Sequence, residues 1–352
     1  MRSCHRFSTW FLAIACAGWA LPASAAEWEK YLLDDTNFIL SVNVRQVLQS
    51  PLFMKHFQRQ FEELLKTEGA QAVLKDTGVN PFQDIESLVV VMGKSSLPGE
   101  GVKEAADALS RGPLIVVHGR FDADKVQARI EQAAKDMPEV IKIRGIGKAN
   151  VAEFTAPLTV PEIKYFAVVL DKTTLVLAPR RGQIEDVLEK AAGDRKTELK
   201  DPVLRQLMKA LDLKQAINVA ATSDAVVNSR YSSMTQNEKK TVTVKHERFG
   251  DFGIEALTGK GSVDNDIRGK VTLATKDAES AKKLNGMLEQ TLSQIKEEGE
   301  RQIVREKHHE KEIAALLEAI KTVRVSAKGR EVTLEGHAGA AAVQAVIKHD
   351  FP

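Results

Sequence analysis

Cysteine and aromatic residues are scarce in this chain, and each shortage argues against a class of function. Both cysteines, Cys4 and Cys16, lie near the start of the 352 residues, so a chain that loses its first 25 residues has neither a disulfide nor thiol chemistry. Aromatic residues make up 5% of the sequence, and Trp28 is the last tryptophan. Because sugar-binding sites rely on aromatic ring faces, a carbohydrate-binding role is disfavoured.

The chain also has very little net charge. It contains 50 Lys and Arg against 48 Asp and Glu, and the first 25 residues include Arg2 and Arg6 but no acidic residue. A chain that begins at residue 26 therefore has equal numbers of acidic and basic residues, with histidine counted as neutral. Because nucleic-acid binding depends on a surplus of Lys and Arg, we expect no nucleic-acid partner.

The amino terminus has the pattern of a cleaved export signal. The basic stretch at residues 1–6 precedes the uncharged residues 7–21, and Ala23-Ser24-Ala25 has the small side chains of a cleavage site. The strongly apolar part is about a dozen residues long, whereas a membrane span needs about 20. We therefore expect a signal peptide at residues 1–25, no transmembrane anchor after cleavage, and a periplasmic or secreted mature protein.

The rest of the chain alternates between predicted strands and predicted helices. Four helices are expected to begin at a capping residue, followed in two of them by proline: Ser50-Pro51, Asp122, Asp201-Pro202 and Asp277. Shorter helices are predicted at residues 184–192 and 340–347. β-branched and apolar runs predict strands at residues 38–44, 85–92, 114–121, within 140–154 and 165–177, at 216–220, 249–263 and 267–274, and as a hairpin at 323–335.

The order of these elements repeats with a period near 180 residues. A strand followed by an Asp-capped helix occurs in Leu114–Ala134 and again in Ile267–Leu292. Because short loops join neighbouring strands, the sheets are expected to be mostly antiparallel. The predicted fold class is α+β, with two similar lobes at residues 26–198 and 199–352 and helices packed on one face of each sheet. Two separate domains and two halves of one saddle-shaped unit are both compatible with this repeat.

A long charged helical segment, at about residues 277–321, has no counterpart in the first lobe. Its apolar seam is interrupted at residues 296–312, where only two residues are apolar. A helix without a wide apolar stripe does not lie flat on a core. We consider two interpretations: a solvated connector or projecting helical hairpin, and an arm that binds a partner. Gly299 is the expected hinge, because glycine costs about 1 kcal/mol relative to alanine within a helix.

No motif in the chain completes a catalytic, cofactor-binding or metal-binding site. Residues 92–95 (MGKS) end like a phosphate loop but lack its earlier glycine. His308 and Glu312 share a helix face, yet two ligands do not make a zinc site. Asp264-Asn265-Asp266 begins like a calcium loop but places Arg268 at a ligand position, so we predict a turn there. We therefore predict no catalytic residue, no metal ligand and no cofactor.

Several short runs in the first lobe resemble a class of exported bacterial proteins of unknown function. The resemblance lies mainly within residues 31–92, and its motifs are Tyr31-Leu-Leu-Asp-Asp-Thr-Asn37, Val42-Asn-Val-Arg45, Ser50-Pro51-Leu52 and Gly78-Val-Asn-Pro-Phe-Gln-Asp-Ile85. It implies export and a duplicated α+β build, and it supplies no catalytic residues.

Two hypotheses of function follow from the sequence. In the first, the chain is a non-enzymatic envelope protein that binds a protein or another envelope component through a sheet face, a cleft between the halves or the charged arm. In the second, it is an exported hydrolase whose site is assembled from distant residues. The second hypothesis requires a pocket in which histidine and carboxylate side chains converge.

Overall fold

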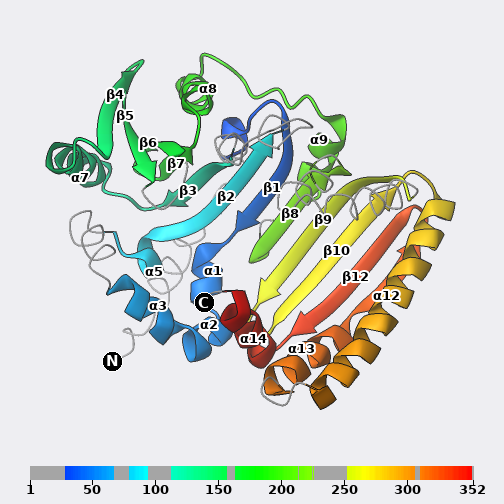
Figure 1. Cartoon of the computed structure of the whole chain (residues 1–352). Coiled ribbons are helices and arrows are strands. Elements are labelled where there is room, and N and C mark those ends of the chain that lie inside the picture. The colour runs from blue at the N-terminus through cyan, green and yellow to red at the C-terminus, as the bar shows by residue number, and fades with distance from the viewer. Residues whose placement is uncertain are drawn as a thin grey trace, which may run out of the picture.

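A single antiparallel sheet of twelve strands, with helices on both sides, dominates the structure (Figure 1). The computed structural model describes residues 28–66, 79–93, 112–156, 163–212, 214–223, 225, 252–305 and 310–350. The predicted α+β class and its antiparallel sheet are confirmed. None of the helices in these ranges has the length and apolarity needed to cross a membrane. The signal peptide expected at residues 1–25 lies outside the described residues.

The first half of the chain supplies seven strands. They are β1 (Thr36–Val42), β2 (Ile85–Gly93), β3 (Leu114–Gly119), β4 (Ile141–Ile146), β5 (Ala149–Ala156), β6 (Ile163–Asp171) and β7 (Thr174–Ala178). The helical elements described before, between and after them are η1 (Trp28–Tyr31), α1 (Val44–Leu48), α2 (Pro51–His56), α3 (Gln58–Leu65), α5 (Pro81–Asp84), α7 (Ala123–Asp136) and α8 (Arg181–Ala192).

Among the described residues, the second half supplies five strands and the 28-residue helix α12. Its strands are β8 (Ile217–Thr222), β9 (Ile254–Val263), β10 (Ile267–Thr275), β11 (Arg324–Lys328) and β12 (Glu331–Ala338). Its helices are α9 (Pro202–Lys209), α12 (Ala278–Arg305), α13 (Glu310–Thr322) and α14 (Ala340–Asp350).

The predicted helix starts are confirmed. Ser50, Asp122, Asp201 and Asp277 each accept a hydrogen bond from a backbone N–H group in the first turn of the following helix. These bonds satisfy donors that have no partner within the helix. The helix expected after Ser50 is divided, because α2 ends before Phe57 and α3 begins after it.

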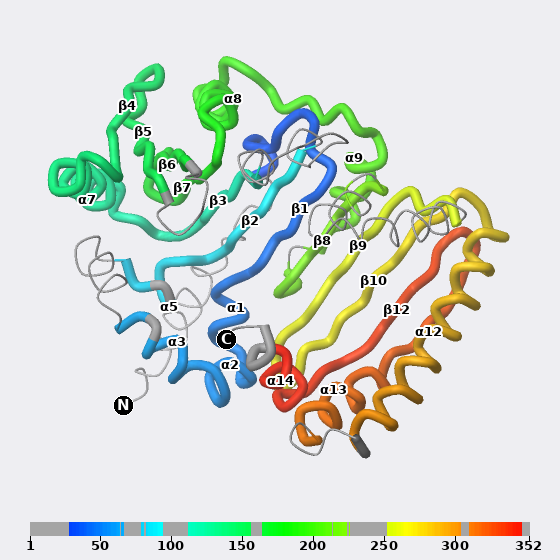
Figure 2. The backbone as a smooth tube through the Cα atoms, in the orientation of Figure 1, coloured from blue at the N-terminus to red at the C-terminus, as the bar shows by residue number. Residues whose placement is uncertain are grey.

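The two halves of the chain meet in the middle of the sheet. The strand order is β11-β12-β10-β9-β8-β1-β2-β3-β7-β6-β5-β4, so β1 is hydrogen-bonded to β8. In this pair Ile39 lies opposite Ala220, and Leu40 lies opposite Val219. Figure 2 shows the blue β1 alongside the green β8 at this junction. The backbone ladder is therefore continuous between the two predicted lobes.

Strand register assigns every sheet residue to one of two faces. The face that carries Val89, Val116 and Val176, which lie directly opposite one another, is named the α8 face. In the first half of the chain these valines form one buried cluster with residues of η1, α8 and α9, including Ile184 and Leu204. The opposite face is named the α12 face.

The α12 face is covered by different helices. On α12, Ala281 and Leu284 are buried against Val332 of β12, and Leu273 of β10 packs on the same cluster. The expectation of helices on a single face is therefore wrong. The reason is visible in β2, where residues 88–91 are apolar at consecutive positions and both sides of the strand must be shielded from water.

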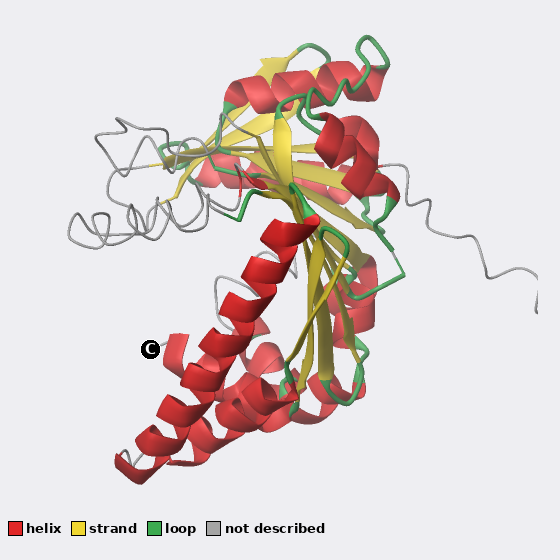
Figure 3. Cartoon of the chain, turned by 90° about the vertical axis from the view of Figure 1, so that its right-hand side faces the viewer, coloured by secondary structure: helices red, strands yellow, loops and turns green. Residues whose placement is uncertain are grey.

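The described residues of the charged segment belong to two helices, α12 and α13, which lie against each other. Lys321 Nζ of α13 lies 3.6 Å from Glu300 Oε1 of α12, and seen from the side α12 diverges from the sheet along its length (Figure 3). Gly299, the expected hinge, lies inside the unbroken α12. A Cβ atom at Gly299 would lie 3.0 Å from Leu317 Cδ1. Gly299 is therefore a packing position that lets α13 approach closely, and its role as a hinge stays a prediction.

Four charged side chains form a ring of ion pairs that joins the segment before β1 (residues 28–35) to α8. Lys190 Nζ, which is almost fully buried, donates hydrogen bonds to Asp34 Oδ1 (2.9 Å), Asp186 Oδ2 (2.6 Å) and Leu32 O (2.7 Å). Arg195 pairs with the same two carboxylates. Burial opposes ionisation of Asp34, but the hydrogen bonds from Lys190 and from the backbone N–H of Glu198, together with the charges of Lys190 and Arg195, outweigh it and lower the pKa of Asp34. Asp34, which lies in the turn before β1, therefore also belongs to an ion network.

Candidate binding surface on the sheet

The α8 face changes from apolar to charged as it passes from the first half of the chain to the second. One row of directly opposite residues begins at the buried Val89 and continues through Ser41 and Asn218. On the next four strands, β9, β10, β12 and β11, the same row consists of Lys260, Lys270, Glu335 and Arg324. These charged residues are exposed or half-exposed, which is the pattern of a sheet face turned to solvent.

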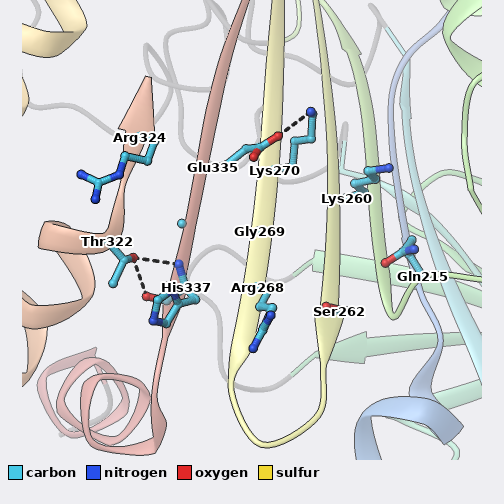
Figure 4. Close-up of a pocket in the computed structure, with 11 residues that line it drawn as sticks. Gln215, Lys260, Ser262, Arg268, Gly269, Lys270, Thr322, Arg324, Glu335 and His337 are labelled. Atoms are coloured by element: carbon cyan, nitrogen blue, oxygen red, sulfur yellow. Dashed lines mark hydrogen bonds and ion pairs between the residues drawn. The ribbon is translucent and has the colours of Figure 1, made fainter. Parts of the chain in front are cut away.

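The charged part of this row lines an open cavity of about 410 Å³ (Figure 4). A second row beside it contains Ser262, Arg268 and His337. We name these two rows the polar sheet face, and its seven members are Lys260, Ser262, Arg268, Lys270, Arg324, Glu335 and His337.

Positive charge on the polar sheet face is only partly compensated. Lys260 lies directly opposite Lys270, an arrangement that is unfavourable for two like charges. Lys270 Nζ is bonded to Glu335 Oε1 at 2.5 Å, which neutralises one of the two lysines. Lys260 and Arg324 have no ion pair within 4.0 Å among the described residues. A cation without an ion pair therefore stands at each end of the charged part of the row, although the charge of Lys260 also helps to lower the pKa of Asp212.

The second row is held in place by hydrogen bonds at both ends of its strands. Arg268 Nε lies 3.1 Å from Asp266 Oδ1. The Thr322 hydroxyl accepts a hydrogen bond from the backbone N–H of His337 and donates one to its carbonyl oxygen, both at 2.9 Å. These contacts fix the end of β12 against the carboxyl end of α13, and they leave the His337 side chain on the open face (Figure 4).

The arrangement suits binding rather than proton transfer. Ser262 on β9 and His337 on β12 are separated by β10, which is about 10 Å at two strand spacings. A nucleophile and its base need to approach to about 3 Å. The one carboxylate in the rows, Glu335, is already engaged by Lys270. Within the described ranges no three His, Asp or Glu side chains are placed to hold a metal ion.

The motifs considered in the sequence lie away from this surface or at its border. Asp264-Asn265-Asp266 is the tight turn between β9 and β10, as predicted, and Arg268 contacts Asp266 there. Gly93 is the last residue of β2, and Glu312 belongs to α13. Lys94, Ser95 and His308 lie outside the described residues.

Lys260, Lys270 and Arg324 belong to none of the motifs considered in the sequence, and Arg268 entered only as the residue that does not fit a calcium loop. The available signal was strand alternation. In β9, Lys260 and Ser262 alternate with glycines and apolar residues, and in β10 Arg268 and Lys270 do the same. Such period-2 alternation predicts a strand with one solvent-facing side. It does not show which strands lie side by side.

Comparison of the chain with protein families, with curated proteins and with solved structures finds no match in any of the three. The function is therefore inferred from the polar sheet face and its charges.

Proposed function

We propose that this protein is an exported, non-enzymatic envelope protein that binds an acidic segment of another protein through the polar sheet face. The mature chain begins at residue 26 and acts in the periplasm or outside the cell. The observation that carries the proposal is that two cations, Lys260 and Arg324, have no ion pair among the described residues and lie on a sheet face turned to solvent. Carboxylates of a partner placed between them relieve the repulsion of Lys260 by Lys270.

The spacing of the cations fits an extended acidic chain. Lys260 and Arg324 are three strand spacings apart, which is about 14 Å. Successive side chains on the same side of an extended peptide are about 7 Å apart, so two or three acidic residues span the row. A partner that crosses the strands in this way contacts both cations together.

Binding of poly-L-glutamate to the full chain, measured by isothermal titration calorimetry, tests this proposal. The double substitution Lys260→Glu with Arg324→Glu is expected to weaken binding at least about tenfold, because it reverses both cations that have no ion pair. Lys142→Glu with Lys148→Glu is the matched control, since both lysines are exposed on the distant β4–β5 hairpin. Equal losses in the two double variants would overturn the proposal.

Two further outcomes of the same titration are informative. Duplex DNA bound as tightly as poly-L-glutamate would contradict a protein partner and indicate general attraction of polyanions. A probe held by the charged α12–α13 hairpin instead would be unaffected by the substitutions at Lys260 and Arg324, which would likewise contradict the assignment to the polar sheet face.

We also propose that the sheet is built from a duplicated unit. The spatial order β1-β2-β3-β7-β6 in the first half corresponds to β8-β9-β10-β12-β11 in the second. The spacing in sequence from Asn37 to Asn218 equals that from Ser41 to Thr222. All four residues are buried. A twofold axis at the central Ile39–Ala220 pair exchanges Asn37 with Asn218 and Ser41 with Thr222, as expected for two copies of one unit. The proposed units are the lobes at 26–198 and 199–352, with β4 and β5 as an addition to the first.

A further inference from the structure

A second candidate site lies at α9, on a different part of the molecule from the polar sheet face. Two cavities of about 450 and 520 Å³ occupy the space between η1, the segment that follows α8, and α9. They adjoin, because four residues line both: Glu29, Leu199, Arg205 and Met208. We name the combined depression the α9 groove.

The floor of the α9 groove is apolar. Leu32 is buried in the main core cluster, and Leu199 and Met208 are half-buried residues packed against that cluster. The floor is thus the outer surface of the core between η1 and α9. When an apolar ligand covers half-buried side chains of this kind and removes them from water, the complex is stabilised by about 25 cal/mol for each Å² covered.

The rim of the α9 groove is cationic. Lys196, Arg205 and Lys209 are exposed, and none of them has an ion pair within 4.0 Å among the described residues. Arg195 also lines the groove, but its guanidinium is bound to Asp34 and Asp186. The single carboxylate in the lining is Glu29. The excess of positive charge around an apolar floor favours a ligand that is both anionic and apolar.

The walls of the groove are fixed by contacts that do not involve a ligand. Thr197 Oγ1 donates a hydrogen bond to Lys30 O at 2.7 Å, and the backbone N–H of Lys200 donates one to Asp34 O at 2.9 Å. The ring of charges around Lys190 anchors the same segment to α8. A site formed in advance loses less conformational entropy on binding, so its contacts translate more fully into affinity.

We propose that the α9 groove binds an amphiphile with an anionic head group and a single alkyl chain. The carboxylate or phosphate head lies at Arg205 and Lys196, and the chain lies along Leu199 and Met208. The size of each cavity falls within the range of small-molecule sites, about 300–1,000 Å³. This site is separate from the proposed acidic-protein surface and does not depend on it.

Calorimetric titration of the full chain with four probes below their micelle concentrations tests the assignment. Dodecanoate and dodecyl phosphate carry both features, inorganic phosphate has only the anion, and dodecyl maltoside has only the chain. The two anionic amphiphiles are expected to bind at least about tenfold more tightly than either of the other probes, because only they use both the rim and the floor.

The substitution Arg205→Glu identifies the site. It is expected to weaken dodecanoate and dodecyl phosphate binding at least about tenfold. Glutamate suits the first turn of α9, where Arg205 lies, so the variant is expected to fold, as circular dichroism will verify. Lys200→Glu is the matched control, because Lys200 is an exposed cation of the same segment that lines neither cavity.

Three results would overturn the inference. The first is that the Arg205→Glu and Lys200→Glu variants bind dodecanoate equally well. The second is that dodecyl maltoside binds as tightly as dodecanoate, and the third is that inorganic phosphate does so. The variant with Lys260→Glu and Arg324→Glu is expected to bind dodecanoate normally, so failure at one surface is distinguishable from failure at the other.

Discussion

At the scale of single residues, the buried Lys190 is the most consequential charge in the structure. Its ammonium group has three oxygen partners, so each of its N–H groups is used. The partners come from the segment before β1 and from α8, which are far apart in sequence. Lys190 therefore holds α8 and the amino-terminal segment in one position, and through them the wall of the α9 groove.

Replacing Lys190 with methionine is expected to lower the free energy of unfolding by about 3–5 kcal/mol, because Asp34 and Asp186 are left facing each other with one cation fewer. Urea unfolding measures the loss. The matched control is Arg181→Met on the same helix, where an exposed pair with Glu185 is removed at a cost of about 0.5 kcal/mol or less. Similar losses in the two variants would contradict the role of Lys190.

Capping residues were predictable from sequence, and the ion network was not. Ser50 and Asp122 act on N–H groups three residues away, so their role is visible in the local sequence. Lys190 and Asp34 are 156 residues apart, and only the fold brings them together. The shared location of Lys260 and Arg324 was not predictable either, because only the strand order places them on one surface.

At the scale of elements, the contact between α12 and α13 depends on the missing side chain of Gly299. Leucine is a better helix former than glycine, so Gly299→Leu raises the helix propensity, and any loss of stability must come from packing. It is expected to destabilise the protein by about 1–3 kcal/mol, because the new side chain meets Leu317. Hydrogen exchange should show faster exchange in α13.

Gly286→Leu in the same helix is the matched control for Gly299. A Cβ atom at Gly286 has no neighbour within 4 Å, so leucine there gains helix propensity without a clash. It is expected to stabilise the protein by about 0.5–1 kcal/mol. Stabilisation by both substitutions would show that α13 does not need the close approach at Gly299.

Local sequence patterns predicted whether a segment forms a helix or a strand better than they predicted which other elements it packs against. The hairpin expected around Lys328-Gly329 is present as β11 and β12, and Gly329 has a φ of +60°, which glycine adopts without strain. The distribution of helices over the two sheet faces was not predicted. Periodicity shows that an element has an apolar side, but it does not show which element covers it.

At the scale of the whole molecule, the β1–β8 pair is expected to make the sheet unfold as one unit. Hydrogen exchange at increasing urea concentration should show β2–β3 and β9–β10 losing protection together. Ala220→Pro in β8 removes a backbone donor at the centre and should lower the stability of both halves. Ser326→Pro in the edge strand β11 is the control and should act locally.

Earlier loss of protection in one half would contradict a single cooperative sheet. It would favour two separate domains, the arrangement that the sequence also allowed. The repeat in element order suggested two units, but it did not reveal that their first strands pair with each other. Pairing between β1 and β8 involves residues far apart in the chain, and no local pattern encodes it.

The central position of β1 has a consequence for a chain emerging from the ribosome. β1 is made early, yet one of its two neighbours, β8, begins only at Ile217. Until then, Ile39 and Leu40 belong to an open strand edge that any other extended peptide is able to join. The interval between the appearance of these two strands therefore exposes the unfinished protein to aggregation, and a holding chaperone that keeps the chain unfolded until the proposed export protects it during that interval.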